Sequence, residues 1–287
     1  MSYLSEDGLQ LRADVAGPDE SPEIILLHGG GQTRFSWHRS LQDLVKAGYR
    51  VTAPDLRGHG QSEWSSDGCY ELDHYIADLR VILGTLSKAP VVIGASLGGV
   101  ISLIALGEGA ISNLKALVLV DVVPRMDAAG VGEILDFMAA TQQGFSNPEA
   151  ARDAIARYLP HRPRASRLDG LLKNLRLKDD GRYYWHWDPR IHNEASVDRR
   201  LASMAKRMEA AAASIRIPVL VLRGAASRVV SREGAAHLAA LIPHAEFVDV
   251  ASADHMIAGD QNDAFIAEIL SFLSAINEVG SNENYRV

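Results

Sequence analysis

Six short apolar runs recur along the chain, and four of them are continuous runs of Val, Ile and Leu. They lie at 24–27, 49–53, 91–93, 117–120, 219–222 and 246–250. Continuous Val, Ile and Leu runs are typical of strands covered on both faces, as in a parallel sheet. Apolar residues at helical spacing occur at 41–46, 73–86, 97–106, 235–241 and 264–276. Strands alternating with helices predict an α/β fold with a mostly parallel central sheet flanked by helices.

The alternation breaks between about Pro124 and Ser214. That region is rich in helix-forming residues and holds no comparable apolar run. A chain of 287 residues suits one large domain with an insertion. We therefore expect a core formed by 1–124 and 214–287, and an α-helical cap, or lid, formed by 125–213. Near the N-terminus, Asp7-Gly8 between two extended segments predicts a hairpin.

Composition excludes several classes of protein. The formal net charge is −7, and phosphate recognition requires a positive face, so we expect no nucleic-acid partner. Cys69 is the one cysteine, and no Cys/His cluster has zinc-ligand spacing, so we expect no metal. Neither a signal peptide nor an apolar run of 18 residues is visible, which predicts a cytoplasmic chain with no membrane partner. The sequence leaves open whether the chain forms a homo-oligomer.

The strongest local signal is Gly94–Gly99, which reads Gly-Ala-Ser-Leu-Gly-Gly. It follows an apolar run and opens a helical segment, the context that a G-x-S-x-G nucleophile elbow requires. Gly94 and Gly98 leave room for a sharp turn between strand and helix. The turn presents Ser96 near a helix N-terminus, where developing negative charge is favoured. We expect Ser96 to be a nucleophile.

A second signal, His28-Gly29-Gly30-Gly31, directly follows the first apolar run. Glycines let the main chain approach a substrate carbonyl closely, and loops of this type supply an oxyanion-hole donor. We expect the N–H groups of Gly30 and Leu97 to face the oxyanion. His28 itself is expected to be a hydrogen-bonded loop histidine rather than a base.

The third signal is His255, which lies just beyond the last apolar run. A general base needs its imidazole at the same sheet edge as the nucleophile. The loop after a parallel strand satisfies this need, so His255 is the expected base.

Together these residues give the chain a resemblance to the α/β-hydrolase superfamily, in the lid-bearing branch of esterases, lactonases, C–C hydrolases and epoxide hydrolases. The stretch Asp55–Ser62 (Asp-Leu-Arg-Gly-His-Gly-Gln-Ser) is similar to a family loop whose role is usually structural. Epoxide hydrolases and haloalkane dehalogenases of this branch carry an aspartate at the elbow. The resemblance with Ser96 there implies acyl chemistry and no cofactor.

The chain departs from the family pattern at the acid of the triad. Most relatives place the acid after the seventh strand, where this chain reads Arg223–Val230 without any carboxylate. Ser227 or Arg228 occupies the corresponding position, and an arginine beside His255 would oppose formation of the imidazolium.

Two explanations compete. Some superfamily members, including lactonases that open resorcylic macrolactones, carry the acid after the sixth strand, and Asp121 directly follows the run at 117–120. The alternative is loss of function, since losing the orienting carboxylate can cost about 10⁴ in turnover. We favour relocation to Asp121.

Aromatic residues concentrate in the predicted lid between Tyr183 and Trp187. Such residues line apolar pockets. Trp185 and Trp187 are candidates for a substrate-binding wall, with simple lid packing an equal alternative. Met126 at the start of the lid is a weaker candidate.

We expect a serine hydrolase that cleaves a carboxylic ester or lactone with an apolar or aromatic substrate, and a bulky macrolactone of the resorcylic type is a first choice for testing. Three alternatives stay open. One is a C–C bond hydrolase with the same triad. Another is a disabled hydrolase scaffold that binds ligands. The weakest is a cofactor-free oxygenase or haloperoxidase-like activity.

Overall fold

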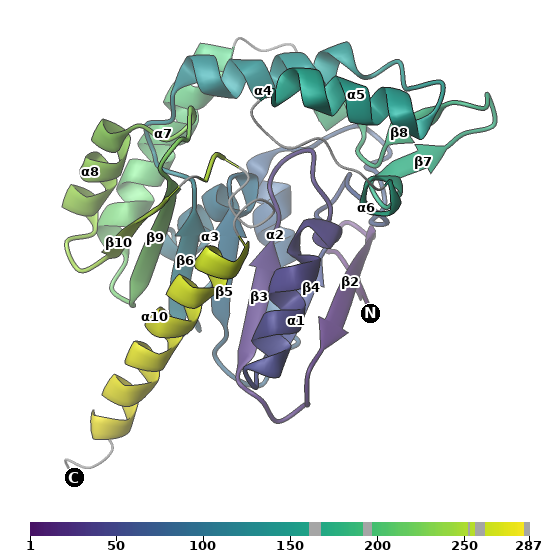
Figure 1. Ribbon diagram of the computed structural model, residues 1–287. Coiled ribbons are helices and arrows are strands. Elements are labelled where there is room, and N and C mark those ends of the chain that lie inside the picture. The colour runs from purple at the N-terminus through teal and green to yellow at the C-terminus, as the bar shows by residue number, and fades with distance from the viewer. Residues whose placement is uncertain (161–167, 192–196, 252, 256–261, 284–287) are drawn as a thin grey trace.

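The computed structural model describes residues 1–160, 168–191, 197–251, 253–255 and 262–283. An eight-stranded sheet runs through it in the order β1-β2-β4-β3-β5-β6-β9-β10 (Figure 1). These strands are β1 (Ser2–Leu4), β2 (Gln10–Ala16), β3 (Glu23–Leu27), β4 (Arg50–Pro54), β5 (Val91–Ala95), β6 (Ala116–Val120), β9 (Val219–Gly224) and β10 (Glu246–Val250). β2 pairs in antiparallel fashion with both β1 and β4, and the neighbours in the order β4-β3-β5-β6-β9-β10 all pair in parallel. The six predicted strands and the predicted hairpin are confirmed.

Helices cover both faces of the sheet, as the alternation predicted. One face carries α1 (His38–Lys46), which follows the short helix η1 (Arg34–Trp37), and α10 (Asn262–Glu283). The other face carries α2 (Leu72–Leu83), α3 (Leu97–Gly107), α7 (Val197–Ser214) and α8 (Arg232–Leu241). No helix in the described part of the chain combines the length and apolar character needed to cross a bilayer.

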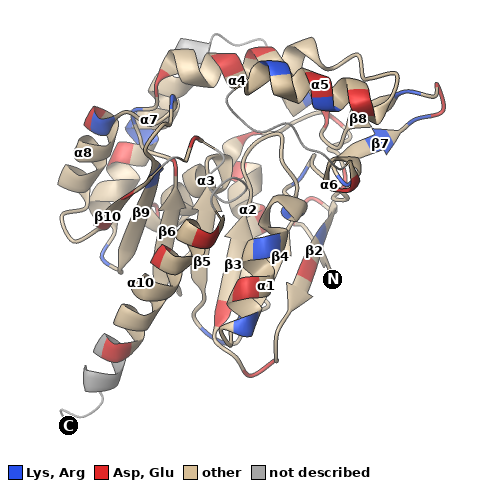
Figure 2. Ribbon diagram, in the orientation of Figure 1, with Lys and Arg blue, Asp and Glu red and all other residues tan. Residues whose placement is uncertain are grey.

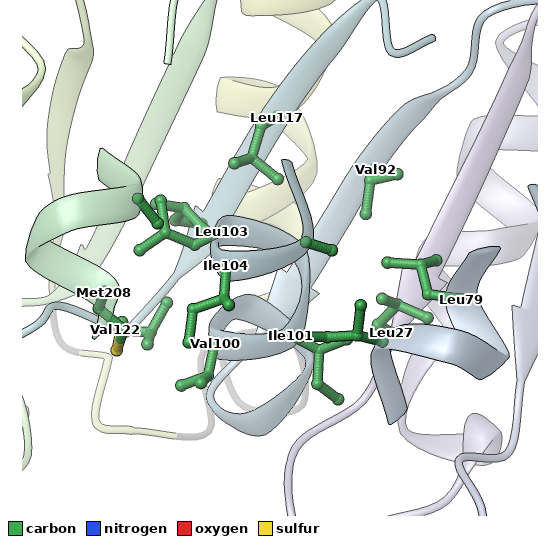
Figure 3. Close-up of a cluster of buried hydrophobic side chains, with 14 of the residues drawn as sticks. Leu27, Leu79, Val92, Val100, Ile101, Leu103, Ile104, Leu117, Val122 and Met208 are labelled. Carbon is green, nitrogen blue, oxygen red and sulfur yellow. The ribbon is translucent and has the colours of Figure 1, made fainter. Parts of the chain in front are cut away.

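The core explains why the strand runs are continuous rather than alternating. Val92 and Leu117 point to the α3 side, and Ile93 and Val118 point to the α1–α10 side. Figure 3 shows the first of these clusters, in which strand residues meet α3 and Met208 of α7. Each fully buried aliphatic side chain contributes about 1.5–3 kcal/mol. Figure 2 shows charged residues on the flanking helices, on loops, on the segment above the sheet and on strand β2, with none on β5 or β6.

The segment between β6 and β9 lies above the edge of the sheet where the strands end (Figure 1). It contains α4 (Ala128–Ala140), α5 (Pro148–Tyr158), α6 (Asp169–Leu172), the antiparallel pair β7 (Leu175–Leu177) and β8 (Tyr183–Trp185), and η2 (Pro189–Ile191). Its own apolar cluster includes Met138, Phe145, Trp185 and Trp187. We call the part of this segment from 125 to 191 the cap.

Helix α7 is the last element of the segment between β6 and β9, but it packs on the core. A Cβ on Gly107 of α3 would collide with the backbone of Ala211, and Met208 is fully buried in the core cluster. The helix therefore belongs to the layer that covers the sheet, although the predicted cap included it. The division of the chain at residue 213 stays a prediction.

Candidate active site

Ser96 sits at a tight bend between β5 and α3. Its backbone has φ 47° and ψ −114°, a left-handed conformation that costs a non-glycine residue on the order of 1–3 kcal/mol. A Cβ on Gly94 would lie 2.5 Å from the carbonyl oxygen of Gly98, so strand and helix approach too closely for any larger residue. The predicted strand–turn–helix context of Ser96 is confirmed, and its role as nucleophile stays a proposal.

Asp121 occupies the equivalent place on the next strand. Ala95 pairs with Val120, so Ser96 and Asp121 are the first residues beyond paired positions on neighbouring parallel strands. The Ser96 N–H also donates to the carbonyl of Val120 at 3.1 Å. Among the described residues, Ser96 and Asp121 (φ 48°) are the two non-glycine residues with positive φ. Strain of this kind clusters at functional sites.

The carboxylate of Asp121 is buried and accepts three hydrogen bonds. Nδ1 of His255 lies 2.6 Å from Oδ2, the hydroxyl of Ser227 donates to the same oxygen at 2.6 Å, and the Gly224 N–H donates to Oδ1 at 2.9 Å. Asp121 is 1% exposed, so these contacts replace its hydration. Because Nδ1 of His255 donates its hydrogen to Asp121, Nε2 carries the lone pair that a general base needs.

Ser227 is a site residue whose part the sequence analysis missed. Its Oγ accepts the N–H groups of Val229 and Val230 at 3.2 and 3.1 Å, so its own hydrogen is directed to Asp121. The sequence did hold a sign of this role, because Ser227 occupies a position at which most members of the resembled family carry the acid of the triad. A hydroxyl there reaches the carboxylate from the neighbouring strand.

No hydrogen bond joins Arg228 to His255 within the described residues. Its guanidinium forms an ion pair with Glu133 of α4, and both side chains are about half exposed. The charge of Arg228 is therefore paired with a carboxylate of the cap, and its effect on the imidazolium stays a prediction.

The glycine loop that follows β3 runs beside the elbow. A Cβ on Gly29 would lie 3.2 Å from the Cβ of Ser96, and one on Gly30 would lie 3.9 Å from Cδ2 of Leu97. We call residues 28–32 the oxyanion loop.

Three of the four amides at positions 29 to 32 are already engaged. Gly29 donates to the side chain of Gln32, Gly31 donates to Nε2 of His59, and Gln32 donates to the carbonyl of Gly29. In the described part of the chain, the N–H of Gly30 has no acceptor, and neither has that of Leu97. These are the two donors expected at the oxyanion hole.

No hydrogen bond joins the Ser96 hydroxyl to His255 within the described residues. Catalytic hydrogen bonds are often long in ligand-free enzymes and tighten when substrate binds. The described residues also hold no group of three His, Cys, Asp or Glu side chains arranged for a metal ion.

The candidate substrate-binding residues lie in different parts of the structure, some inside the cap and one against the core. Trp185 stacks on Trp187 with centroids 5.1 Å apart, and its indole N–H donates to Thr141, so Trp185 packs inside the cap. Met126 is half-buried against the core. Met138, a further candidate at the start of the predicted lid, lies against the glycine loop, since a Cβ on Gly31 would lie only 2.8 Å from its Cε.

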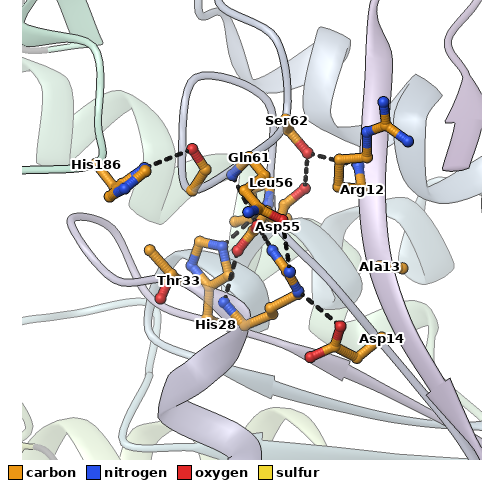
Figure 4. Close-up of polar contacts among 12 residues, drawn as sticks. Arg12, Ala13, Asp14, His28, Thr33, Asp55, Leu56, Gln61, Ser62 and His186 are labelled. Carbon is orange, nitrogen blue, oxygen red and sulfur yellow. Dashed lines mark hydrogen bonds and ion pairs between the residues drawn. The ribbon is translucent and has the colours of Figure 1, made fainter. Parts of the chain in front are cut away.

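A separate charged hollow of about 640 Å³ lies between strand β2 and the cap. Its lining includes neither Ser96, Asp121 nor His255, so it is not the acyl site. Asp14, which Figure 4 labels, forms an ion pair with Arg34 at 3.0 Å. The lining residues are Met1, Arg12, Ala13, Asp14, Arg34, Gln61, Arg176 and His186.

The comparisons with known proteins agree with this geometry. The family model for the alpha/beta hydrolase fold matches residues 22–260, so the chain belongs to the α/β-hydrolase family. It is 30% identical to "Esterase Rv0045c" of Mycobacterium tuberculosis, over 86% of this chain and 80% of the relative. It is 27% identical to a "3-hydroxybutyrate-oligomer hydrolase" of Cupriavidus necator, over 88% and 89% of the two chains.

A solved structure of an "E-2-(Acetamidomethylene)succinate Hydrolase" superposes with a TM-score of 0.79. The match covers 96% of this chain and 99% of the hydrolase chain at 21% sequence identity, and it supports the fold. The predicted fold class is confirmed, and the relatives support the predicted ester hydrolase.

Proposed function

We propose that the chain is a serine hydrolase that cleaves carboxylic esters or lactones through an acyl-enzyme. The observation that carries the proposal is the hydrogen bond between Asp121 and His255 at the strand end next to Ser96. An aspartate that holds Nδ1 of a histidine beside a serine elbow is the arrangement that activates a weak alcohol nucleophile. An esterase and an oligomer hydrolase among the relatives support this class of reaction.

In this mechanism the Ser96 hydroxyl attacks the substrate carbonyl while Nε2 of His255 takes its proton. The Gly30 and Leu97 amides hold the oxyanion, and each such donor is worth about 3 kcal/mol of transition-state stabilisation. Asp121 keeps the imidazole oriented and stabilises it when charged. His255 then returns the proton to the leaving alkoxide. Water repeats the sequence on the acyl-enzyme and releases the acid.

The substrate group that lies under the cap is proposed to be apolar. Met138 places a thioether against the oxyanion loop, and Trp187 joins the backbone of His59 through a β-bridge. Apolar side chains above the reacting carbonyl favour an aliphatic or aromatic acyl group. A bulky lactone remains a substrate class to test, because the acid follows the sixth strand as in the lactonases that the sequence resembles.

Two alternatives use the same residues. A C–C bond hydrolase would attack a vinylogous diketone with the same triad, and parallel assays on esters and diketones separate the two. A disabled scaffold that only binds ligands is less well supported, because the Asp121 carboxylate contacts His255 although the segment after the seventh strand carries no acid.

The test is labelling with a fluorophosphonate, together with turnover of aryl esters of increasing acyl length and of lactones. We expect stoichiometric labelling at Ser96, loss of labelling in Ser96→Ala, and turnover that rises with apolar acyl size. Tight ligand binding without labelling would support the disabled scaffold instead.

A further inference from the structure

Two buried histidines on neighbouring loops each bind the backbone of the other's loop. Nε2 of His28, in the oxyanion loop, accepts the N–H of Leu56 at 3.0 Å. Nε2 of His59, in the loop after β4, accepts the N–H of Gly31 at 3.1 Å. Figure 4 shows His28 beside Leu56. The two loops are thereby joined by a reciprocal pair of hydrogen bonds.

The second nitrogen of each ring fixes its protonation. Nδ1 of His28 lies 2.8 Å from the carbonyl oxygen of Gly29, and Nδ1 of His59 lies 2.9 Å from that of Arg57. A carbonyl only accepts, so both Nδ1 atoms carry the hydrogen and both Nε2 atoms are acceptors. Neither histidine is exposed to solvent. Their rings meet edge to face with centroids 5.2 Å apart.

The bond from Gly31 matters because the oxyanion loop is built of glycines. Glycine adopts many backbone conformations, and Gly31 has φ +72°, so local preference alone does not hold this loop. The contact with His59 fixes the peptide plane that directly follows Gly30. With the neighbouring amides engaged, the N–H of Gly30 is left to bind substrate.

The loop that carries His59 also holds the cap. His59 forms an antiparallel bridge with Trp187, Gly60 donates its N–H to the carbonyl of His186 at 2.6 Å, and Asp188 donates to Gly58 at 2.8 Å. His59 therefore connects the end of the cap hairpin directly to the oxyanion loop.

We propose that His59 is a positioning residue for the oxyanion hole, acting through Gly31 to keep the Gly30 N–H aimed at the substrate oxygen, with His28 as its reciprocal partner. The inference rests on the proposed function, since it assigns a task within the same site. It predicts that the acceptor at Nε2, and not the ring alone, is what catalysis requires.

Two substitutions separate these requirements. In His59→Asn the side-chain amide can still bind the carbonyl of Arg57 but is too short to reach Gly31. In His59→Gln the side-chain oxygen reaches the Nε2 position and can accept from Gly31. His186→Asn is the matched control, because His186 binds the carbonyl of Gly60 on the same loop without touching the oxyanion loop.

The kinetic experiment measures kcat and KM per active site, with active sites counted by fluorophosphonate titration, and the affinity for a trifluoromethyl ketone. That ketone forms a hemiketal oxyanion with the serine and so reports on the hole. We expect His59→Asn to lower kcat and ketone affinity by about 10- to 100-fold with KM within about threefold. We expect His59→Gln to recover most of the loss and His186→Asn to behave as wild type. An unchanged kcat per active site in His59→Asn overturns the proposal.

A second readout does not depend on activity or on a folded variant. In the ¹⁵N-labelled wild-type protein, a scalar coupling across the N–H···N bond should join Gly31 to Nε2 of His59, and its absence overturns the proposal. If the coupling is present but the protein neither labels nor hydrolyses esters, then the proposed function fails while the contact between the loops stands.

Discussion

Nδ1 of His255 lies 2.6 Å from Oδ2 of Asp121, although 134 residues separate them in the chain. The contact is made at the edge of the sheet where β6 ends at Val120, and His255 follows β10. The carboxylate reaches the imidazole from the strand next to the one that carries Ser96.

Replacing Asp121 with Asn tests whether this contact drives turnover. The amide fits the same space but would hold the wrong tautomer of His255, so kcat should fall by about 10⁴ while folding is preserved. Steady-state kinetics on an aryl ester measure the loss. Asp254→Asn is the matched control, because Asp254 accepts the backbone N–H of His255 rather than a hydrogen of its ring, and the change should alter kcat by less than about threefold. A large loss in the control with none in Asp121→Asn would contradict the assignment.

Replacing Arg228 with Asp tests the opposite explanation, in which the site is silent for lack of an acid after β9. Arg228 pairs with Glu133 on the surface, so the change should alter turnover by less than about fivefold. Assays on esters and lactones with the wild type and the variant check this. A silent wild type that becomes active in Arg228→Asp would establish the disabled scaffold.

Replacing Ser227 with Ala tests the hydroxyl that supports Asp121. The change leaves an oxygen of Asp121 and the Val229 and Val230 N–H groups with fewer partners. Leaving buried polar groups unpaired costs about 1–3 kcal/mol each, so urea denaturation should show a loss of at least that size. Turnover should fall with it, because the carboxylate is less firmly held. Ser227→Thr keeps a hydroxyl and should retain most of the stability; equal losses in both variants would contradict this role.

The unfolding free energy should depend on pH through His28. Desolvation by burial lowers the pKa of His28 to about 4, from 6.5 in the unfolded chain. The unfolded state therefore binds the extra proton first, and this share of stability is complete above pH 6.5 and is lost as pH falls toward 4. Between pH 6.5 and 4, the contribution of His28 to the unfolding free energy should change by up to about 1.4 kcal/mol per pH unit.

Urea denaturation at several pH values measures this slope, and His28→Asn is the comparison because asparagine does not titrate. The variant should be less stable at pH 7 and show a shallower slope between pH 6.5 and 4. Asp7 should not contribute to the slope between pH 6.5 and 4. Its hydrogen bond with Arg57 lowers its pKa to about 2, so the stability that it contributes is lost below pH 4. Identical slopes in the two proteins would show that His28 is not responsible.

The sequence by itself determined the layered fold and the elbow. Apolar runs such as Val91–Ile93 must be covered on both faces, and that requirement predicts a parallel sheet between helices before any contact is known. The glycines around Ser96 predict the turn, because no larger residue fits between strand and helix. The resemblance of the Ser96 and His255 motifs to a known family gave their expected roles.

Only the tertiary structure decided how the acid is supplied and how the oxyanion loop is held. Asp121, Ser227 and His255 come from three separate strand ends, and their hydrogen bonds depend on strand order and register. The same holds for His28 and His59, whose rings exchange backbone contacts between loops that follow adjacent strands. Local patterns predict elements because they act between near neighbours, whereas these contacts join distant parts of the chain that only the packed sheet brings within hydrogen-bond distance.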